Sequence, residues 1–203
     1  DDDLATTLST APGTSDFTLE YWAKQDTLTN WQTHFATTRG NGFNVGTDGS
    51  GDFVFFTSLG GGRTIEKIGV VPIGQWNHWA FVRTSGVTTG YLNGIAQGSF
   101  SDSYNYTPTA AKIGNLVSGN EYTNGSISNL RLVVGTAVYT SSFKPPTEPL
   151  TSITNTVLLC CNNSSTTGKT TGGTITANGG PTASTDSPFD DPAGFVFGES
   201  GSE

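Results

Sequence analysis

Apolar and polar side chains alternate with a period of two along several short stretches of this chain. In residues 17–23 every second side chain is apolar, and residues 76–83 form the strongest stretch of this kind. A period of two is typical of a strand with one buried face. Between two further stretches lies Asn93-Gly94, which favours the type I′ turn of a β-hairpin because both residues accept positive φ. The pattern therefore predicts antiparallel strands joined by tight turns.

About eleven such stretches follow one another as far as Cys161, with turn signals at intervals of roughly 8–12 residues. This spacing predicts an all-β sandwich or barrel. The expected strands cover residues 17–23, 31–37, 42–45, 52–57, 64–70, 76–83, 88–92, 95–98, 111–114, 125–134 and 156–161.

The composition supports this fold class and marks off a tail. Of 203 residues, 33 are Thr, 20 are Ser and 27 are Gly, whereas good helix formers are scarce and Met is absent. Residues 162–187 are almost all Thr, Ser, Gly, Asn and Ala, with Ile175 as the single large apolar side chain, so they bury little apolar surface. We expect a domain at residues 1–161 and an irregular tail at 162–203, in which a linker is followed by contact residues at 187–192 and 195–197. The tail is expected to lead to a further module.

The charge balance excludes several classes of function. Nine scattered basic residues against seventeen acidic ones give a net charge of −8. The sequence therefore has no cluster of positive charge that would bind the phosphates of a nucleic acid. No run of 18 apolar residues is present, so we expect no membrane insertion. A chain that begins with Asp1 and lacks Met is expected to be a piece of a longer protein.

Four motifs occur in a characteristic order. They read FTLEYWA at residues 17–23, GQWNHWAFVR at 74–83, GYLNG at 90–94 and GSISNLR at 125–131. Together they resemble the laminin-G-like, concanavalin-A-like jelly roll, in which an E-x-W strand, a W-x-H-x-A-x-x-R strand and a Y-x-N-G hairpin recur in this order. The resemblance covers roughly residues 4–161 and implies a two-sheet antiparallel jelly-roll sandwich, which is the fold that we expect.

A narrower resemblance rests on four later segments, at residues 130–139, 143–150, 158–161 and 187–191. These are similar to laminin-G-like modules of large structural proteins in tailed phages, notably those that infect marine cyanobacteria. The resemblance implies a non-enzymatic module of a tail fibre or appendage, exposed on the virion outside the cell. Its partners would be host cell-surface polysaccharide, in host adhesion, and other virion subunits in a larger oligomeric assembly. The alternative is a purely architectural module whose aromatic loops pack against other subunits.

The acidic residues do not form a hydrolase pattern. Glycoside hydrolases need two carboxylates that face each other across a sugar bond. The relevant branch with this kind of jelly roll carries an E-x-D-x-x-E strand, which is missing from this sequence. Glu20 stands alone on its strand, and Asp186 belongs to the Pro-containing tail. We therefore expect no enzymatic activity.

Calcium is the one cofactor that the sequence brings into question, since laminin-G-like modules often carry it at a loop edge. Calcium takes six to eight oxygen ligands. Asp48 with Asp52, or Asp102 with Glu121, could supply carboxylates from loops. The alternative is that these are solvated aspartates of turns, and no D-x-D-x-D-G loop is present.

The histidines and cysteines show no ligand spacing for zinc. His78 is in phase with Trp76, which predicts that its ring points at the core and bonds to the backbone. Cys160 and Cys161 are adjacent, so a regular strand would aim them at opposite faces. We expect both to be packing residues and not a redox pair.

Sugar recognition would need exposed aromatic rings beside amide and hydroxyl groups, and two loops supply them. One loop follows Phe100, the other lies at residues 119–124, and the loops at one end of a jelly roll gather together. The alternative is that these rings cover the core or pack against a neighbouring chain. The candidate residues are Tyr104, Tyr106, Asn120, Tyr122, Trp31 and His34.

Overall fold

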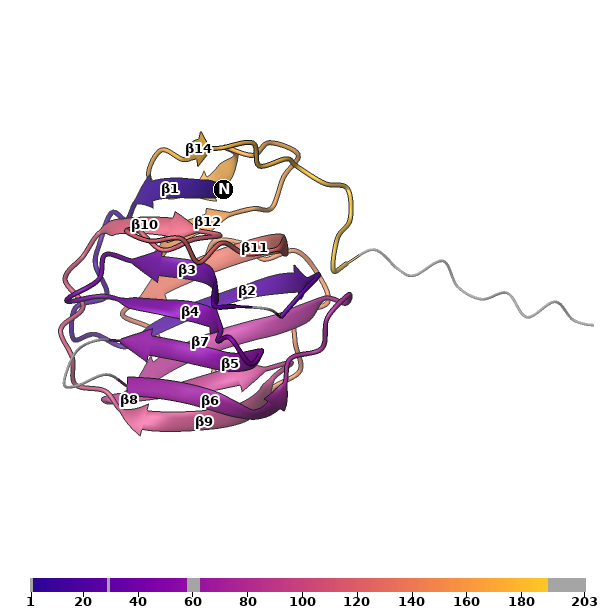
Figure 1. Ribbon diagram of the computed structural model, residues 1–203. Helices are drawn as coiled ribbons and strands as arrows, with labels where there is room; N and C mark the ends of the chain where they lie inside the picture. Colours follow the sequence, from indigo (N-terminus) through magenta and orange to yellow (C-terminus); the bar gives the residue numbers. More distant parts are fainter. Residues whose placement is uncertain (1, 29, 58–62, 190–203) are drawn as a thin grey trace, which may run out of the picture.

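In the part of the chain that the structure describes, two antiparallel sheets of seven strands each pack face to face (Figure 1). The structure is a computed structural model that describes residues 2–28, 30–57 and 63–189. All regular elements in these ranges are strands, which confirms the all-β jelly-roll sandwich. Within the same ranges, no helix is long and apolar enough to cross a lipid bilayer.

The first sheet, called the β1 sheet, has the strand order β14-β1-β10-β3-β4-β5-β6. Its strands are β1 (Asp3–Thr7), β3 (Gln32–Thr37), β4 (Phe43–Thr47), β5 (Asp52–Thr57), β6 (Arg63–Val70), β10 (Ala110–Ile113) and β14 (Thr176–Asn178). The second sheet, called the β2 sheet, has the order β13-β12-β11-β2-β7-β8-β9. Its strands are β2 (Phe17–Gln25), β7 (Asn77–Thr84), β8 (Val87–Leu92), β9 (Ile95–Ser101), β11 (Gly125–Val134), β12 (Thr156–Cys160) and β13 (Lys169–Thr171).

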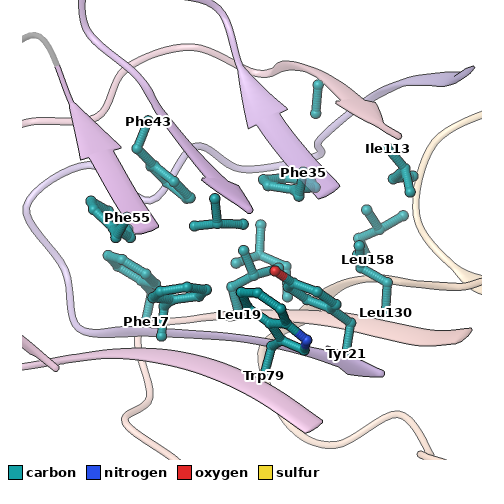
Figure 2. Packing of buried hydrophobic residues seen from close by; sticks show 14 of the residues in the cluster. Phe17, Leu19, Tyr21, Phe35, Phe43, Phe55, Trp79, Ile113, Leu130 and Leu158 are labelled. Carbon is teal, nitrogen blue, oxygen red and sulfur yellow. The ribbon is translucent and has the colours of Figure 1, made fainter. Parts of the chain in front are cut away.

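Alternate side chains of β2 form the centre of the core, as the period of two predicts. Phe17, Leu19 and Tyr21 are fully buried and face the β1 sheet (Figure 2). Phe43 of β4 stacks on Phe17 with ring centroids 5.5 Å apart, and Tyr21 stacks on Trp79 of β7 at 5.9 Å. Aromatic rings thus link the two sheets across the core.

The face of β7 that enters the core is the opposite of the expected one. Trp79 lies in the core, whereas His78, Ala80 and Val82 lie on the outer face of the β2 sheet. Residues 137–143, which we call the strap, pack over this outer face. Both faces of β7 are therefore buried, so apolar periodicity alone could not tell them apart.

A buried charge cluster lies between the strap and the β2 sheet. Oε1 of Glu20 accepts hydrogen bonds from Nε and Nη2 of Arg131 at 3.0 and 2.6 Å. Oε2 accepts the hydroxyl of Tyr139 at 2.8 Å and lies 3.3 Å from Nε2 of His78. Burial by itself would raise the pKa of Glu20, but the contacts with His78 and Arg131 outweigh it and the pKa is lowered. Glu20 is therefore an internal anchor for the strap.

Part of the expected linker folds onto the sandwich. β14 pairs with β1 and β13 pairs with β12, so each sheet gains one short edge strand from the tail. Ile175, between these strands, is buried in the core cluster. The remainder of residues 162–189 is irregular, as expected, and the expected contact residues at 195–197 lie outside the described ranges.

Arg83 organises the end of the sandwich at which β7 finishes. Its guanidinium donates to the carbonyl oxygens of Gly13, Ser15 and Tyr104 at 2.6–2.8 Å. The carboxylate of Asp102 lies 3.5 Å from Nη1, and both side chains are fully buried. One cation thereby holds two loop segments that are distant in sequence, residues 13–15 and 102–104, because a buried charge must be satisfied by hydrogen bonds and a counter-ion.

We predict that Arg83→Met lowers the free energy of unfolding by about 3–5 kcal/mol, because the substitution leaves Asp102 buried without its cation. Urea unfolding measures the change. The matched control is Arg39→Met, which removes an exposed partner 3.6 Å from Glu121 and should cost no more than about 1 kcal/mol. Equal losses in the two variants would contradict the role assigned to Arg83.

Candidate functional site

A cleft with a volume of about 440 Å³ opens at the end of the sandwich where β2 finishes. Its floor and sides come from the first residues of β11, the last residues of β10, the start of β1 and the loop residue Trp76. Segments 163–166 and 180–186 of the tail complete the wall. A volume of this size is in the range of small-molecule sites in proteins.

The loop between β10 and β11 is held firmly against this cleft. Oδ1 of the buried Asn115 accepts hydrogen bonds from the backbone of Leu116 and of Glu121, at 2.8 and 3.0 Å. The backbone N–H of Asn124 donates to Oε1 of Gln32 at 2.8 Å. Internal side-chain acceptors thus fix a loop that has no regular secondary structure.

The tail reaches the cleft from the β1 sheet, and its last described residue, Phe189, contacts the outer face of the β2 sheet. The N–H of Gly180 donates to Asp2 at 2.8 Å. The carboxylate of Asp186 pairs with Lys24 and accepts the indole N–H of Trp76 at 3.1 Å. Beyond this pair, Phe189 packs edge-on against Trp22 of β2. These contacts hold the tail in place, so that it forms one wall of the cleft.

The cleft offers many hydrogen-bonding groups and an acidic surface. Hydroxyl groups line it together with the amides of two Asn side chains and the indole of Trp76. Its carboxylates belong to Asp2, Asp3, Asp26 and Asp186. Hydrogen bonds from Lys24 and then Trp76 lower the pKa of Asp186. Burial opposes ionisation of Asp3, but hydrogen bonds from Lys112, Asn178 and Asn115 outweigh burial and lower its pKa. The hydroxyl groups that line the cleft belong to Thr123, Ser126, Ser128, Ser165, Thr166, Thr182 and Ser184.

The structure brings only half of the expected aromatic surface to this end. Trp31 is 41% exposed, and the side chains of Asn120 and Tyr122 lie in the loop that borders the cleft. Tyr104 and Tyr106 follow β9 and lie at the opposite end, beside Arg83 (Figure 1). The prediction that the two loops gather at one end is therefore wrong. The chain crosses the sandwich on β10 between the two loops, and a strand carries its ends to opposite sides.

Two candidate sugar-binding side chains are internal. Tyr106 is fully buried and its hydroxyl donates to the buried carboxylate of Asp102 at 3.1 Å. His34 is fully buried between Tyr21 and Trp79, because a bulge in β3 turns its side chain inward beside Phe35. Neither can contact a ligand from solvent, so both are corrections to the expected site.

The expected calcium ligands do not come together as a site. Asp102 is buried beside Arg83, while Glu121 lies at the other end, where Thr33 donates to it at 2.9 Å, so their expected pairing is wrong. Oδ1 of Asp48 accepts the backbone N–H of Asp52 at 3.0 Å and shapes the β4–β5 turn. In the described ranges, no three His, Cys, Asp or Glu side chains converge enough to hold a metal ion.

The cysteines also depart from expectation. Cys161 leaves the strand with a φ of 57°, and both cysteines pack against the same core cluster, not on opposite faces. Cys161 additionally lines the cleft. Regular strand alternation does not apply here because β12 ends at Cys160.

Comparison with known proteins places this architecture in a family. A family model described as the concanavalin A-like lectin/glucanases superfamily matches residues 1–137. The chain belongs to this superfamily. No curated protein matches this superfamily member significantly.

Several solved structures share the superfamily fold. A protein from Bacteroides ovatus ATCC 8483, named as a candidate carbohydrate binding protein, superposes with a TM-score of 0.68 at 16% identity. The match covers 88% of this chain and 56% of that one. The CBM40 of Ruminococcus gnavus IT-sialidase, bound to α2,3 sialyllactose, has a TM-score of 0.55 at 11% identity, with 64% and 80% coverage. The heptameric SAP-like pentraxin of Limulus polyphemus has a TM-score of 0.51 at 17% identity, with 68% and 71% coverage.

Sequence reasoning missed the residues that build the cleft of this superfamily member. The period of two predicts that Trp76 lies on the core side of a strand, whereas Trp76 precedes β7 and borders the cleft. Asp26 and Asp186 come from segments 160 residues apart. No local motif marks these positions, and only the place of Trp76 directly after the Pro72 and Gly74 turn signals could have suggested its role.

The buried His34 predicts a pH dependence of stability. Burial lowers its pKa to about 3, whereas an unfolded histidine titrates near 6.5. The unfolded state therefore binds a proton first, and stability present above pH 6.5 is lost as the pH falls toward 3. The expected loss is about 1.4 kcal/mol per pH unit, or about 2 kcal/mol between pH 6.5 and 5.

Urea unfolding at several pH values between 6.5 and 5 measures this slope. Unfolded carboxylates take up protons mainly below this window, because their pKa values lie near 4. In His34→Gln the slope should fall by about one proton per chain, whatever the stability of the variant at pH 7. An unchanged slope in the variant would show that another group causes the dependence.

Proposed function

We propose that this chain is a non-catalytic carbohydrate-binding module whose ligand occupies the cleft between β11 and the tail. The observation that carries the proposal is the lining of the cleft, in which an indole, amides, hydroxyls and carboxylates surround a space of about 440 Å³. Sugars present hydroxyl groups to such donors and acceptors and apolar C–H faces to aromatic rings. The superfamily and the binding partners named for two of the structural neighbours support this choice.

The carboxylates of the module support binding and not hydrolysis. Glu20 is fully buried beneath the strap, with both oxygens engaged by Arg131 and Tyr139. Asp186 is paired with Lys24 and Trp76. A glycosidase needs one carboxyl group that gives up a proton and a second that faces it across the bond. The charged and paired carboxylates of this cleft serve better as acceptors for sugar hydroxyls.

We place the module, by the resemblance of residues 130–139 and 143–150, on the surface of a tailed-phage particle, outside the cell. There it acts in host adhesion as part of an appendage or tail fibre, within a larger assembly of virion subunits. Repetition of the module in the particle turns a weak contact with host polysaccharide into firm attachment, because linked sites raise the effective concentration.

The cleft residues predict a specific loss of binding. Trp76→Ala should weaken the binding of an oligosaccharide that the module retains by about tenfold, since an aromatic contact contributes up to about 1.5 kcal/mol. Isothermal titration calorimetry with ligands selected from a glycan array measures the change. Tyr104→Ala, at the opposite end, is the control and should bind normally. The reverse result would move the site to the Arg83 end.

The acidic lining predicts selectivity for uncharged or amino sugars over acidic ones. Matched oligosaccharides that differ only in a carboxylate should bind at least several-fold more weakly than their neutral forms, and Asp26→Asn should narrow the difference. Rising salt should narrow it too, because ions screen exposed charges. Equal binding of both forms by the wild-type module would contradict this electrostatic account.

Multivalent display separates adhesion from the architectural alternative. A trimeric fusion of the module should be retained on host-envelope polysaccharide, and Trp76→Ala should release it. If the displayed module retains no glycan, the architectural role, with these surfaces packed against other subunits, replaces the proposal. Turnover of a polysaccharide that a single carboxylate substitution abolishes would overturn the non-catalytic assignment.

A further inference from the structure

Two thiols touch at the wall of the cleft. Sγ of Cys161 lies 3.8 Å from Sγ of Cys160, which is within hydrogen-bonding distance for two thiols. In a regular strand, successive side chains point to opposite faces. The contact therefore reflects a local departure from strand geometry that brings the two sulfur atoms together.

The departure has a structural cause in the neighbouring strand. β11 pairs with β2 through an irregularity between Ser128 and Arg131, and Asn129 there has a φ of 52°. The N–H of Asn129 donates to the carbonyl oxygen of Cys161 at 2.8 Å. This bond fixes Cys161 in the left-handed region, at a φ of 57°, which few residues other than glycine and asparagine adopt. The sulfur contact is thus part of the fold.

The two thiols differ in access and in reactivity. Cys160 is fully buried, and its hydrogen-bonding contact with the Cys161 thiol, followed by burial, raises its pKa. Cys161 is only partly buried and lines the cleft, where a small molecule can reach it. Thiolate character and access govern cysteine reactivity, so a reagent from solvent meets Cys161 first.

We propose that Cys160 and Cys161 form a redox-active dithiol that exchanges with low-molecular-weight disulfides through the cleft. The Cys161 thiolate attacks one sulfur of the small disulfide, the S–S bond breaks, and one small thiolate leaves. The Cys160 thiolate then attacks the sulfur of Cys161 and expels the second small thiolate. Two protein thiols are oxidised to one disulfide, and the small disulfide is reduced to two thiols, because the two protons that the cysteines lose are taken up by the leaving small thiolates.

The resulting bond is readily reversible. Adjacent residues have Cα atoms about 3.8 Å apart, which is shorter than the separation of about 4.4–6.8 Å that unstrained disulfides span. Strain makes a disulfide easier to reduce. The pair therefore acts as a switch and not as a structural cross-link, and it is independent of whether the cleft binds sugar.

Oxidised glutathione tests the proposal on the reduced 203-residue chain. At mildly alkaline pH the wild type should lose both titratable thiols, become lighter by two hydrogen atoms and retain no glutathione. Peptide mapping should place the bond between Cys160 and Cys161, and dithiothreitol should restore both thiols. A chain that keeps both thiols, or that ends as a glutathione adduct or a disulfide-linked dimer, overturns the proposal.

Single variants assign the order of attack. Cys160→Ala should stop at a glutathione adduct on Cys161, whereas Cys161→Ala should keep its buried thiol free. Reaction of Cys160 in folded Cys161→Ala at the rate of the wild type would contradict the order. Where a variant does not fold, phenylarsine oxide provides the test on the wild type. One arsenical should bind per chain, with loss of both thiols and release of water, and a chain that binds none overturns the proposal.

Discussion

The packing of aromatic rings between the two sheets is the interaction that holds the whole sandwich together. Phe53 of β5 stacks on both Trp79 and Phe81 of β7 at 4.8 Å, and Phe43 of β4 stacks on Phe17 of β2 (Figure 2). Each large ring buries roughly 150–250 Å² and holds a fixed geometry against its neighbour. A chain in which only 33% of residues are hydrophobic gains much of its core from these few side chains. These rings set the relative position of the two sheets. The positions of the loops at both ends of the sandwich depend on it, because the loops connect the strands of these sheets.

Cations, which are few in this acidic chain, tie segments that lie far apart in the sequence. Arg83 gathers loop carbonyls at one end, and Arg131 joins Glu20 to the backbone carbonyl of Thr151. Lys112 holds Asp3 at 2.7 Å, and Lys24 holds Asp186 of the tail. The ion pairs of Arg83 with Asp102 and of Arg131 with Glu20 are buried. An unpaired charge there would be costly, so these two pairs constrain the fold strongly. The pair at Lys24 is partly exposed and leaves the tail more easily displaced.

The cleft is a consequence of the path of the tail. β14 extends the β1 sheet, and Asp186 and Phe189 then reach the outer face of the β2 sheet. A short segment that spans both sheets in this way leaves a hollow beneath it. The same hollow gives solvent access to Cys161, whereas Cys160 remains in the core. The proposed sugar site and the thiol pair therefore lie at the same wall of the cleft, although they take part in different reactions.

The sequence by itself determined the fold class, the hairpin at Asn93-Gly94 and the core face of β2, because alternation and turn chemistry are local properties. Only the tertiary structure decided the face of β7, since the strap buries the side opposite the core. It also decided that two candidate ligand-binding side chains are internal. Tyr106 is held inside by its hydrogen bond to Asp102, and His34 is turned inward by the bulge in β3. The cleft could not be read from any motif, because its residues come from both ends of the chain and meet only when the tail pairs with β1. Long-range pairing depends on the whole packed molecule, which a local pattern does not encode.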